Sequence, residues 1–187
     1  MPLAARLLLA SGVLAIVAGC AGDAVRPPPR PAAYVDVAAV AKTGTVDAGA
    51  GVASAGQPGA AALEAFAAAG YVAVIDLRGA GEDRGFDEPA VVERLGLEYL
   101  SLPVPSPAAV TFENAEKLDR LLAGIDGPVL VHCASGNRVG ALLALRESLN
   151  GADAEQAVAY GRQAGLTRLE SVVRQRLEDG KTTGQAP

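Results

Sequence analysis

The stretch VLVHCASGNRVG, from Val129 to Gly140, decides how this chain is expected to fold. Its first four residues, Val129 to His132, form a largely apolar run of the kind that is buried in a parallel sheet. Gly136 supplies the backbone freedom that a tight turn needs, and a helical pattern follows from Arg138 to Leu149. The stretch therefore predicts a buried strand, a short loop and a helix, in that order.

Strand and helix patterns alternate on both sides of this stretch. Two further strands are predicted at residues 71–77 and 98–102. Apolar spacing and capping residues predict helices over residues 60–69, 89–95, 111–123, 154–164 and 166–177. Residues 34–51 are weakly patterned, with a short strand or two expected near their ends. This alternation predicts an α/β fold class with a parallel-rich sheet flanked by helices on both faces.

The first 33 residues are expected to lie outside this domain. Residues 1–19 contain one positive charge, an apolar run too short to span a bilayer, and small residues before a cysteine, a pattern typical of an export signal. Residues 20–33 are rich in proline and predict a semi-rigid linker. The domain itself is predicted over residues 34–178, with a flexible tail at 179–187.

The end of the export signal, Val17-Ala-Gly-Cys20, resembles a bacterial lipobox. The resemblance implies cleavage before Cys20 and a lipid on its sulfur, so that the mature protein is anchored to a bacterial membrane and faces the periplasm. Ala21 replaces the aspartate that often marks retention at the inner membrane, which favours the outer membrane. The alternative is an ordinary signal peptide in which Cys20 is incidental.

The net charge and the cysteine count limit which partners and which reactions can be expected. The formal net charge is −5 and the sequence has no basic stripe, so no nucleic-acid partner is expected. An anionic substrate must then be attracted by a few positioned groups, against a mildly repulsive overall field. If Cys20 is acylated, Cys133 is the last remaining thiol, which excludes a disulfide within the domain. A lone thiol in an oxidising compartment indicates a chemical use, with a buried inert cysteine as the alternative.

The loop after the predicted strand has the composition of an anion-binding site with Cys133 as its nucleophile. A helix N-terminus follows Cys133, so loop amides and the helix dipole stabilise negative charge on its sulfur. Arg138 offers a planar fork for two oxygens of a bound anion. His132, the only histidine, points to the opposite face of the strand and is expected to support the loop. No metal or other cofactor is expected. The amides that form this nest belong to Ala134, Ser135, Gly136, Asn137 and Arg138.

HCASGNR, from His132 to Arg138, resembles the signature loop of cysteine-dependent phosphatases. Together with SAGQP at 54–58, VIDLR at 74–78 and EYLSLPV at 98–104, it is similar to the bacterial beta-lactamase-hydrolase-like phosphatases. That family is a branch of the dual-specificity-phosphatase-like fold, and the resemblance covers roughly residues 46–150. It implies a phosphorylated substrate, a thiophosphoryl intermediate on Cys133 stabilised by Arg138, and hydrolysis of that intermediate by water.

Two departures from the phosphatase signature concern its arginine and its acid. Four residues separate Cys133 from Arg138, where the signature usually has five. The loop at 103–110, where those enzymes place an aspartate general acid, contains no carboxylate. Because loops after parallel strands converge, Arg78 is a candidate substrate anchor, or else a partner of Glu82. The candidate acids or substrate contacts, each with a solvated surface charge as the alternative, are Glu82, Asp83, Asp87 and Glu113.

Two other functions remain open. The loop also resembles that of rhodanese-type sulfurtransferases, in which Cys133 would hold a persulfide and no carboxylate acid would be required. A second alternative is a membrane-tethered domain that binds an anion or a partner in the loop without turnover.

Overall fold

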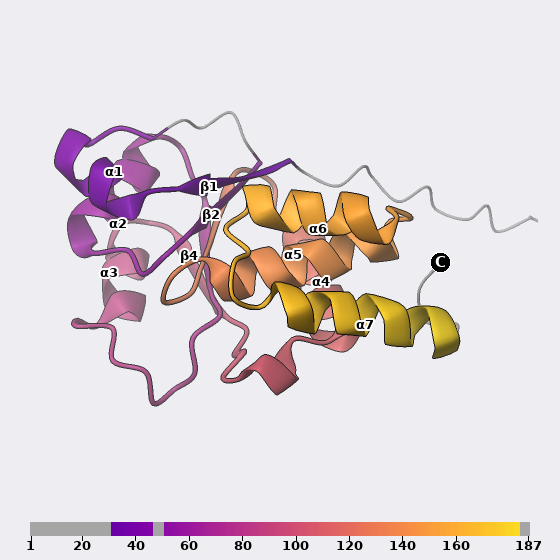
Figure 1. The fold of residues 1–187 in the computed structure, drawn as a ribbon. Helices are drawn as coiled ribbons and strands as arrows, with labels where there is room; N and C mark the ends of the chain where they lie inside the picture. The colour runs from indigo at the N-terminus through magenta and orange to yellow at the C-terminus, as the bar shows by residue number, and fades with distance from the viewer. Residues whose placement is uncertain (1–30, 47–50, 184–187) are drawn as a thin grey trace, which may run out of the picture.

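The computed structural model of this chain describes residues 31–46 and 51–183 (Figure 1). Cys20, the export signal, and most of the predicted linker lie outside the described residues, as do residues 184–187 of the tail. Within the described residues, no helix combines the length and the apolar character that crossing a membrane requires.

The centre of the fold is a parallel sheet of five strands in the order β1-β2-β5-β3-β4. Every strand pair is parallel, which confirms the predicted α/β class with a parallel sheet. The last strand in the sequence, β5, lies in the middle of the sheet and is fully buried. The strands are β1 (Ala32–Val35), β2 (Val52–Ala55), β3 (Ala73–Asp76), β4 (Glu98–Ser101) and β5 (Val129–His132).

Helices cover both faces of the sheet, as predicted (Figure 1). One face carries α1 (Val37–Thr43), α2 (Ala60–Ala68) and α3 (Glu88–Arg94). A short 3-10 turn at Pro107–Ala109 precedes the helices of the other face, which are α4 (Phe112–Gly124), α5 (Asn137–Leu149), α6 (Ala154–Gln163) and α7 (Glu170–Thr183).

Alternation along β5 divides the core into two clusters. Val129 and Val131 join the cluster that includes residues of α4, α5, α6 and α7. Leu130 joins the cluster that includes residues of α1, α2 and α3. Cys133, two residues after Val131, is buried in the same cluster as Val129 and Val131. His132 is fully buried and reaches Glu88, the first residue of α3, so the two neighbours face opposite sides as the strand period requires.

The helix boundaries agree with the expected ones where local capping defines them. Thr111 Oγ1 accepts a hydrogen bond from Asn114 N and begins α4. Asp153 and Gln156 form a capping box at the start of α6. Each of these caps involves residues close together in the sequence, so the helix starts can be predicted from the sequence alone.

Two helices differ from the expectation. The sequence pattern gave no indication of α1, a short helix capped by Asp36 in which only Val40 is buried. The final helix begins at Glu170 instead of Leu166 because a contact with Asn137, distant in sequence, holds the preceding residues in a loop. It continues to Thr183, so residues 179–183 of the predicted tail are helical.

Helices α5 and α6 cross at two glycines. A β-carbon on Gly140 would lie 2.6 Å from the carbonyl oxygen of Gly161 and would also collide with the backbone nitrogen of Leu166. A β-carbon on Gly161 would lie 2.7 Å from the carbonyl oxygen of Gly140. Because the obstacles are backbone atoms, no side-chain rotation can relieve either contact.

We therefore expect Gly140→Ala to lower the free energy of unfolding by about 2 to 3 kcal/mol. The matched control is Gly124→Ala at the end of α4, where a β-carbon would meet open space; it should change stability by less than about 0.5 kcal/mol. Urea denaturation measures both. Equal stability of the two variants would contradict the tight crossing.

Candidate active site

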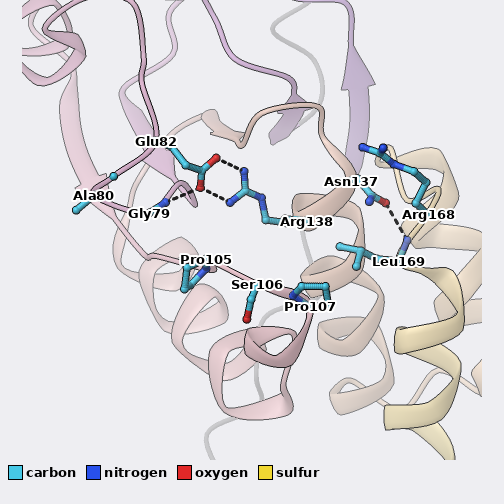
Figure 2. A pocket seen from close by; sticks show the side chains of 11 residues that line it. Gly79, Ala80, Glu82, Pro105, Ser106, Pro107, Asn137, Arg138, Arg168 and Leu169 are labelled. Carbon is cyan, nitrogen blue, oxygen red and sulfur yellow. Dashed lines mark hydrogen bonds and ion pairs between the residues drawn. The ribbon is translucent and has the colours of Figure 1, made fainter.

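A pocket of about 670 Å³ lies where the loops after β3, β4 and β5 meet (Figure 2). This confirms the predicted convergence of those loops at the carboxyl ends of the strands. The loop before α7 closes a further side of the pocket, which the sequence pattern did not indicate. The lining residues are Gly79, Ala80, Gly81, Glu82, Pro105, Ser106, Pro107, Asn137, Arg138, Arg168 and Leu169.

Cys133 follows β5 directly and is 1% exposed. Its backbone amide donates to Ala55 O at 3.3 Å, which continues the pairing of β5 with β2. Gly136 is the N-cap of α5 with φ of 80°, no side chain caps the helix, and its first turn holds no acidic residue. The first amides of α5 therefore have no capping side chain, and the first turn of the helix itself brings no carboxylate to compete with an incoming anion.

Close packing gives a second reason for glycine at 136. A β-carbon there would lie 3.0 Å from Tyr34 Cδ2 and even closer to the neighbouring ring carbon. The ring of Tyr34, on strand β1, thus packs against the loop at Gly136. The positive φ strongly favours glycine at this position, and the ring would have to shift to admit a side chain.

The two loop residues on either side of Gly136 differ in what they contribute. Ser135 is exposed and bridges to Gly56 of the loop after β2. Asn137 is buried, and its Oδ1 accepts hydrogen bonds from Thr167 N and Leu169 N at 2.8 and 3.3 Å. The Asn137 side-chain oxygen therefore holds a neighbouring loop.

Arg138 forms a bidentate pair with Glu82 across the pocket (Figure 2). Nη1 and Nη2 lie 2.6 and 2.7 Å from the two carboxylate oxygens, and Nη1 also donates to Val104 O at 3.0 Å. The hydrogen bonds with Glu82 raise the pKa of Arg138 although burial opposes them, and interaction with the Cys133 side chain adds a smaller contribution in the same direction. The guanidinium thus interacts with the predicted nucleophile, despite the four-residue spacing.

Glu82, a candidate general acid, is a carboxylate in this arrangement. The hydrogen bond from Arg138 lowers the pKa of Glu82 to about 2, with burial opposing and the amide of Gly79 assisting. A group with that pKa carries no proton near neutral pH. While it is paired with Arg138, Glu82 is therefore not a proton donor.

Arg78 does not line the pocket; it contacts the Glu82 carboxylate outside the pocket lining. Its Nε lies 3.3 Å from Glu82 Oε2, and its Nη2 donates to Asp83 O at 2.6 Å. Its Nη1 donates to the side-chain oxygen of Gln57. Of the two roles considered for Arg78, pairing with Glu82 is the one this geometry shows.

The other three candidate acids do not reach the pocket. Asp83 is exposed and accepts from Gly85 N at 2.7 Å. Asp87 is the N-cap of α3, where it accepts from Ala90 N. Glu113 is exposed on α4, where Lys117 forms an ion pair with it at 2.7 Å. Each carboxylate serves local structure, so none is positioned to protonate a leaving group.

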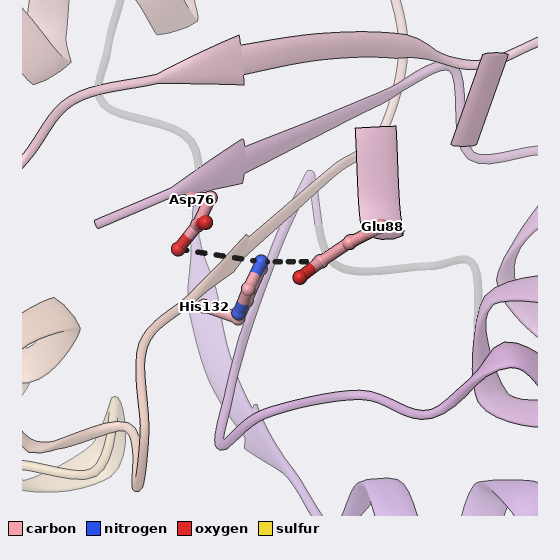
Figure 3. A group of neighbouring side chains, drawn as sticks. All are labelled: Asp76, Glu88 and His132. Carbon is pink, nitrogen blue, oxygen red and sulfur yellow. Dashed lines mark ion pairs between the residues drawn. The ribbon is translucent and has the colours of Figure 1, made fainter. Parts of the chain in front are cut away.

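His132 lies between two buried carboxylates behind the loop (Figure 3). Its Nε2 is 2.8 Å from Glu88 Oε1 and 3.7 Å from Asp76 Oδ1, and all three side chains are fully buried. The three could in principle hold a metal ion. Arg84, however, donates to Asp76 Oδ2 at 2.7 Å through Nε and forms an ion pair with it. This cation favours a hydrogen-bonded network over a metal site.

Two further contacts extend this network, in which, among the described residues, both nitrogens of His132 and Glu88 Oε1 are buried without a hydrogen-bond partner. Tyr99 Oη donates to Asp76 Oδ2 at 2.9 Å, and burial together with that carboxylate raises the pKa of Tyr99 to about 12. Gln57 Nε2 donates to Glu88 Oε2 at 2.9 Å, while Gln57 N donates to Ala134 O in the loop. His132 is therefore connected to the loop through Glu88 and Gln57, and the supporting role of His132 stays a prediction.

Sequence reasoning missed most of this support. Gln57 and Asp76 lie within the motifs SAGQP and VIDLR, so their positions could have been found there. Glu88 and Arg84 lie in a charged loop in which nothing local separates a buried residue from a solvated one. Arg168 follows no strand, and only the tertiary fold brings it to the pocket.

A parallel sheet whose central strand delivers a cysteine to a glycine-containing loop, with an arginine beside the sulfur, defines the cysteine-phosphatase-like class of α/β proteins. Residues 47–150 match the family model described as the phosphatase-like domain of beta-lactamase hydrolase-like protein. The chain belongs to that family.

Relatives and solved structures agree with this assignment. The beta-lactamase hydrolase-like protein of Xylella fastidiosa is 34% identical over 137 residues, which cover 69% of this chain and 32% of the relative. The Agrobacterium fabrum protein of the same name is 32% identical over 101 residues, covering 52% of this chain and 23% of that protein. The chain thus spans a third or less of the length of these relatives.

The structural neighbours are more distant in sequence and show the fold. A protein from Neisseria meningitidis, named as a candidate phosphatase, has a TM-score of 0.57 at 23% identity and covers 66% of this chain and 89% of its own. Tk-PTP in its active form has a TM-score of 0.53 at 22% identity, with 68% and 91% covered. P. aeruginosa TpbA has a TM-score of 0.50 at 22% identity, with 70% and 82% covered. These neighbours show the fold, and the family model is that of a phosphatase-like domain.

Proposed function

We propose that the protein is a cysteine-dependent phosphatase that hydrolyses phosphate monoesters through a thiophosphoryl intermediate on Cys133. The observation that supports the proposal is the position of Cys133 in the loop between β5 and the uncapped N-terminus of α5, where its side chain interacts with Arg138. Both groups stabilise negative charge, first on sulfur and then on the transferred phosphoryl group. One solved neighbour, a cysteine-to-serine variant of TpbA, is described in complex with phosphotyrosine, which adds support for a phosphate ester as substrate.

The reaction has two displacements at phosphorus. The Cys133 thiolate attacks the phosphorus, a P–S bond forms, and the P–O bond to the leaving group breaks. The leaving oxygen departs as an aryloxide or takes a proton from water. Water then attacks the thiophosphoryl group, the P–S bond breaks, and inorganic phosphate leaves as the thiolate is restored. Arg138 and the loop amides bind the phosphoryl oxygens through both steps.

A phosphate must displace Glu82 to reach Arg138. The carboxylate fills the bidentate fork that two phosphoryl oxygens would use. Glu82 has other partners to retain, because Gly79 N donates to it at 2.8 Å and Arg78 lies 3.3 Å away. Displacement therefore exchanges one anion for another on Arg138 while Glu82 stays attached to its own loop.

The proposal predicts that Cys133→Ser lowers hydrolysis of an aryl phosphate by roughly 1,000-fold or more, because the serine hydroxyl is a far weaker nucleophile here. Release of the phenol measures this, with thermal denaturation to confirm that the variant is folded. Thiocyanate formation from thiosulfate and cyanide would instead indicate the sulfurtransferase. Wild type and variant equally inert in both assays would leave the anion-binding alternative.

Displacement of Glu82 predicts that Glu82→Gln binds inorganic phosphate about fivefold to tenfold more tightly than wild type, because the competing charge is gone. Isothermal titration calorimetry at pH 7 measures the affinity. Since the pKa of Glu82 is lowered to about 2, the carboxylate holds Arg138 throughout the neutral and mildly acidic range. The difference should therefore persist down to about pH 4.

The matched control is Glu113→Gln, which removes an exposed carboxylate that does not line the pocket. Its phosphate affinity should equal that of wild type. Weaker phosphate binding by Glu82→Gln would show that Glu82 orients Arg138 instead of competing for it.

We also propose that the protein is exported and anchored by a lipid on Cys20, facing the periplasm and held at the outer membrane. The lipobox-like sequence before Cys20 supports this. Metabolic labelling with a fatty acid should mark wild type and Cys133→Ser, which retains Cys20, and should fail on Cys20→Ala. A labelled Cys20→Ala variant would refute the anchor.

A further inference from the structure

The pocket extends well beyond the loop that would hold a phosphate. Its volume of about 670 Å³ is within the range of sites for whole small molecules. Pro105, Pro107 and Leu169 give it apolar walls next to Arg138. In Figure 2, Arg168 and Leu169 lie on one side, the loop of Glu82 lies on the opposite side, and Arg138 lies between them.

Arg168 differs from its neighbours in having its charge unused. Among the described residues, no hydrogen bond or ion pair engages its exposed guanidinium. Two other arginines in this part of the chain are held: Arg162 by Glu170 at 2.7 Å, and Arg174 by Glu155 at 2.6 Å. In a protein of net charge −5, an unpaired cation on the wall of the pocket is available to a ligand.

The loop that carries Arg168 is fixed to the same helix turn as Arg138. Asn137 Oδ1 accepts from Thr167 N at 2.8 Å, from Thr167 Oγ1 at 3.2 Å and from Leu169 N at 3.3 Å. Asn137 is buried and directly precedes Arg138. The backbone positions of the two arginines are therefore set relative to one another before any ligand binds, which reduces the entropy lost on binding.

We infer that Arg168 is a specificity-determining residue that binds a second anionic group of the substrate, separated from the transferred phosphate by a ring-sized apolar body. The apolar body contacts the walls formed by Pro105, Pro107 and Leu169. The inference rests on the proposed function for turnover, but its binding step can be measured without turnover. A small bis-anionic ester and a phosphotyrosine peptide with an adjacent acidic residue both supply this chemistry.

The test compares two phosphonates that cannot be hydrolysed, 4-carboxybenzylphosphonate and its neutral analogue 4-carbamoylbenzylphosphonate. Wild type should bind the carboxylate about fivefold more tightly, as an exposed ion pair of about 1 kcal/mol gives. Arg168→Gln should bind both equally, and Arg168→Glu should prefer the neutral analogue. Arg120→Gln, which removes an exposed arginine outside the pocket, should keep the wild-type preference. Higher salt should reduce the preference.

Equal affinity of wild type for the two phosphonates, or a preference that survives in Arg168→Gln, would overturn the inference and leave the phosphatase proposal intact. Failure to hydrolyse any aryl phosphate would contradict the phosphatase instead. Two phosphotyrosine peptides, with Glu or Gln next to the phosphotyrosine, distinguish a peptide substrate from a small-molecule substrate. An Arg168-dependent preference for the Glu peptide supports a peptide substrate, and the same preference confined to the phosphonates supports a small molecule.

Discussion

The register of the three central strands is the constraint on which the rest of the structure depends. His132 at the end of β5 pairs in register with Ala55 on one side and Asp76 on the other. The three strands therefore end at one level, and the residues that follow them enter a single region. Slipping β5 by one residue would turn Cys133 toward α3 and His132 toward α5, so the same register decides which of the two side chains lies on the α5 side of the sheet.

Buried charge extends this constraint into the loops. Asp76 and Glu88 are fully buried, and an unpaired carboxylate in that position would cost several kcal/mol. Their partners form a connected series of contacts that begins at His132 and ends at Arg138. It passes through Glu88, Gln57, Arg78 and Glu82. Because each member is oriented by the next, the residue before Cys133 and the arginine after it are positioned by one network.

The sequence predicted the sheet, the helices on both faces and the cysteine loop because those features have local signals. Apolar strands, caps such as Thr111 and the glycine at 136 can each be read from a few neighbouring residues. The interaction of Arg138 with Glu82 could not be read in that way, because 56 positions separate the two residues. Asp83 and Asp87 were equally good candidates for the pocket, since composition does not show which carboxylates of a charged loop turn inward.

The charges around the pocket indicate why its chemistry and its selectivity are connected. Arg138 is neutralised by Glu82 before substrate arrives, so a phosphate gains little net attraction from displacing one anion with another. Phosphate alone is therefore weakly selected, in a chain whose overall charge repels anions. Binding energy must come from elsewhere in the pocket, from its apolar walls and from the unpaired guanidinium of Arg168. If the proposed function holds, a pocket built in this way discriminates among phosphate esters by the rest of the molecule and leaves the common phosphoryl group to the chemistry proposed for Cys133.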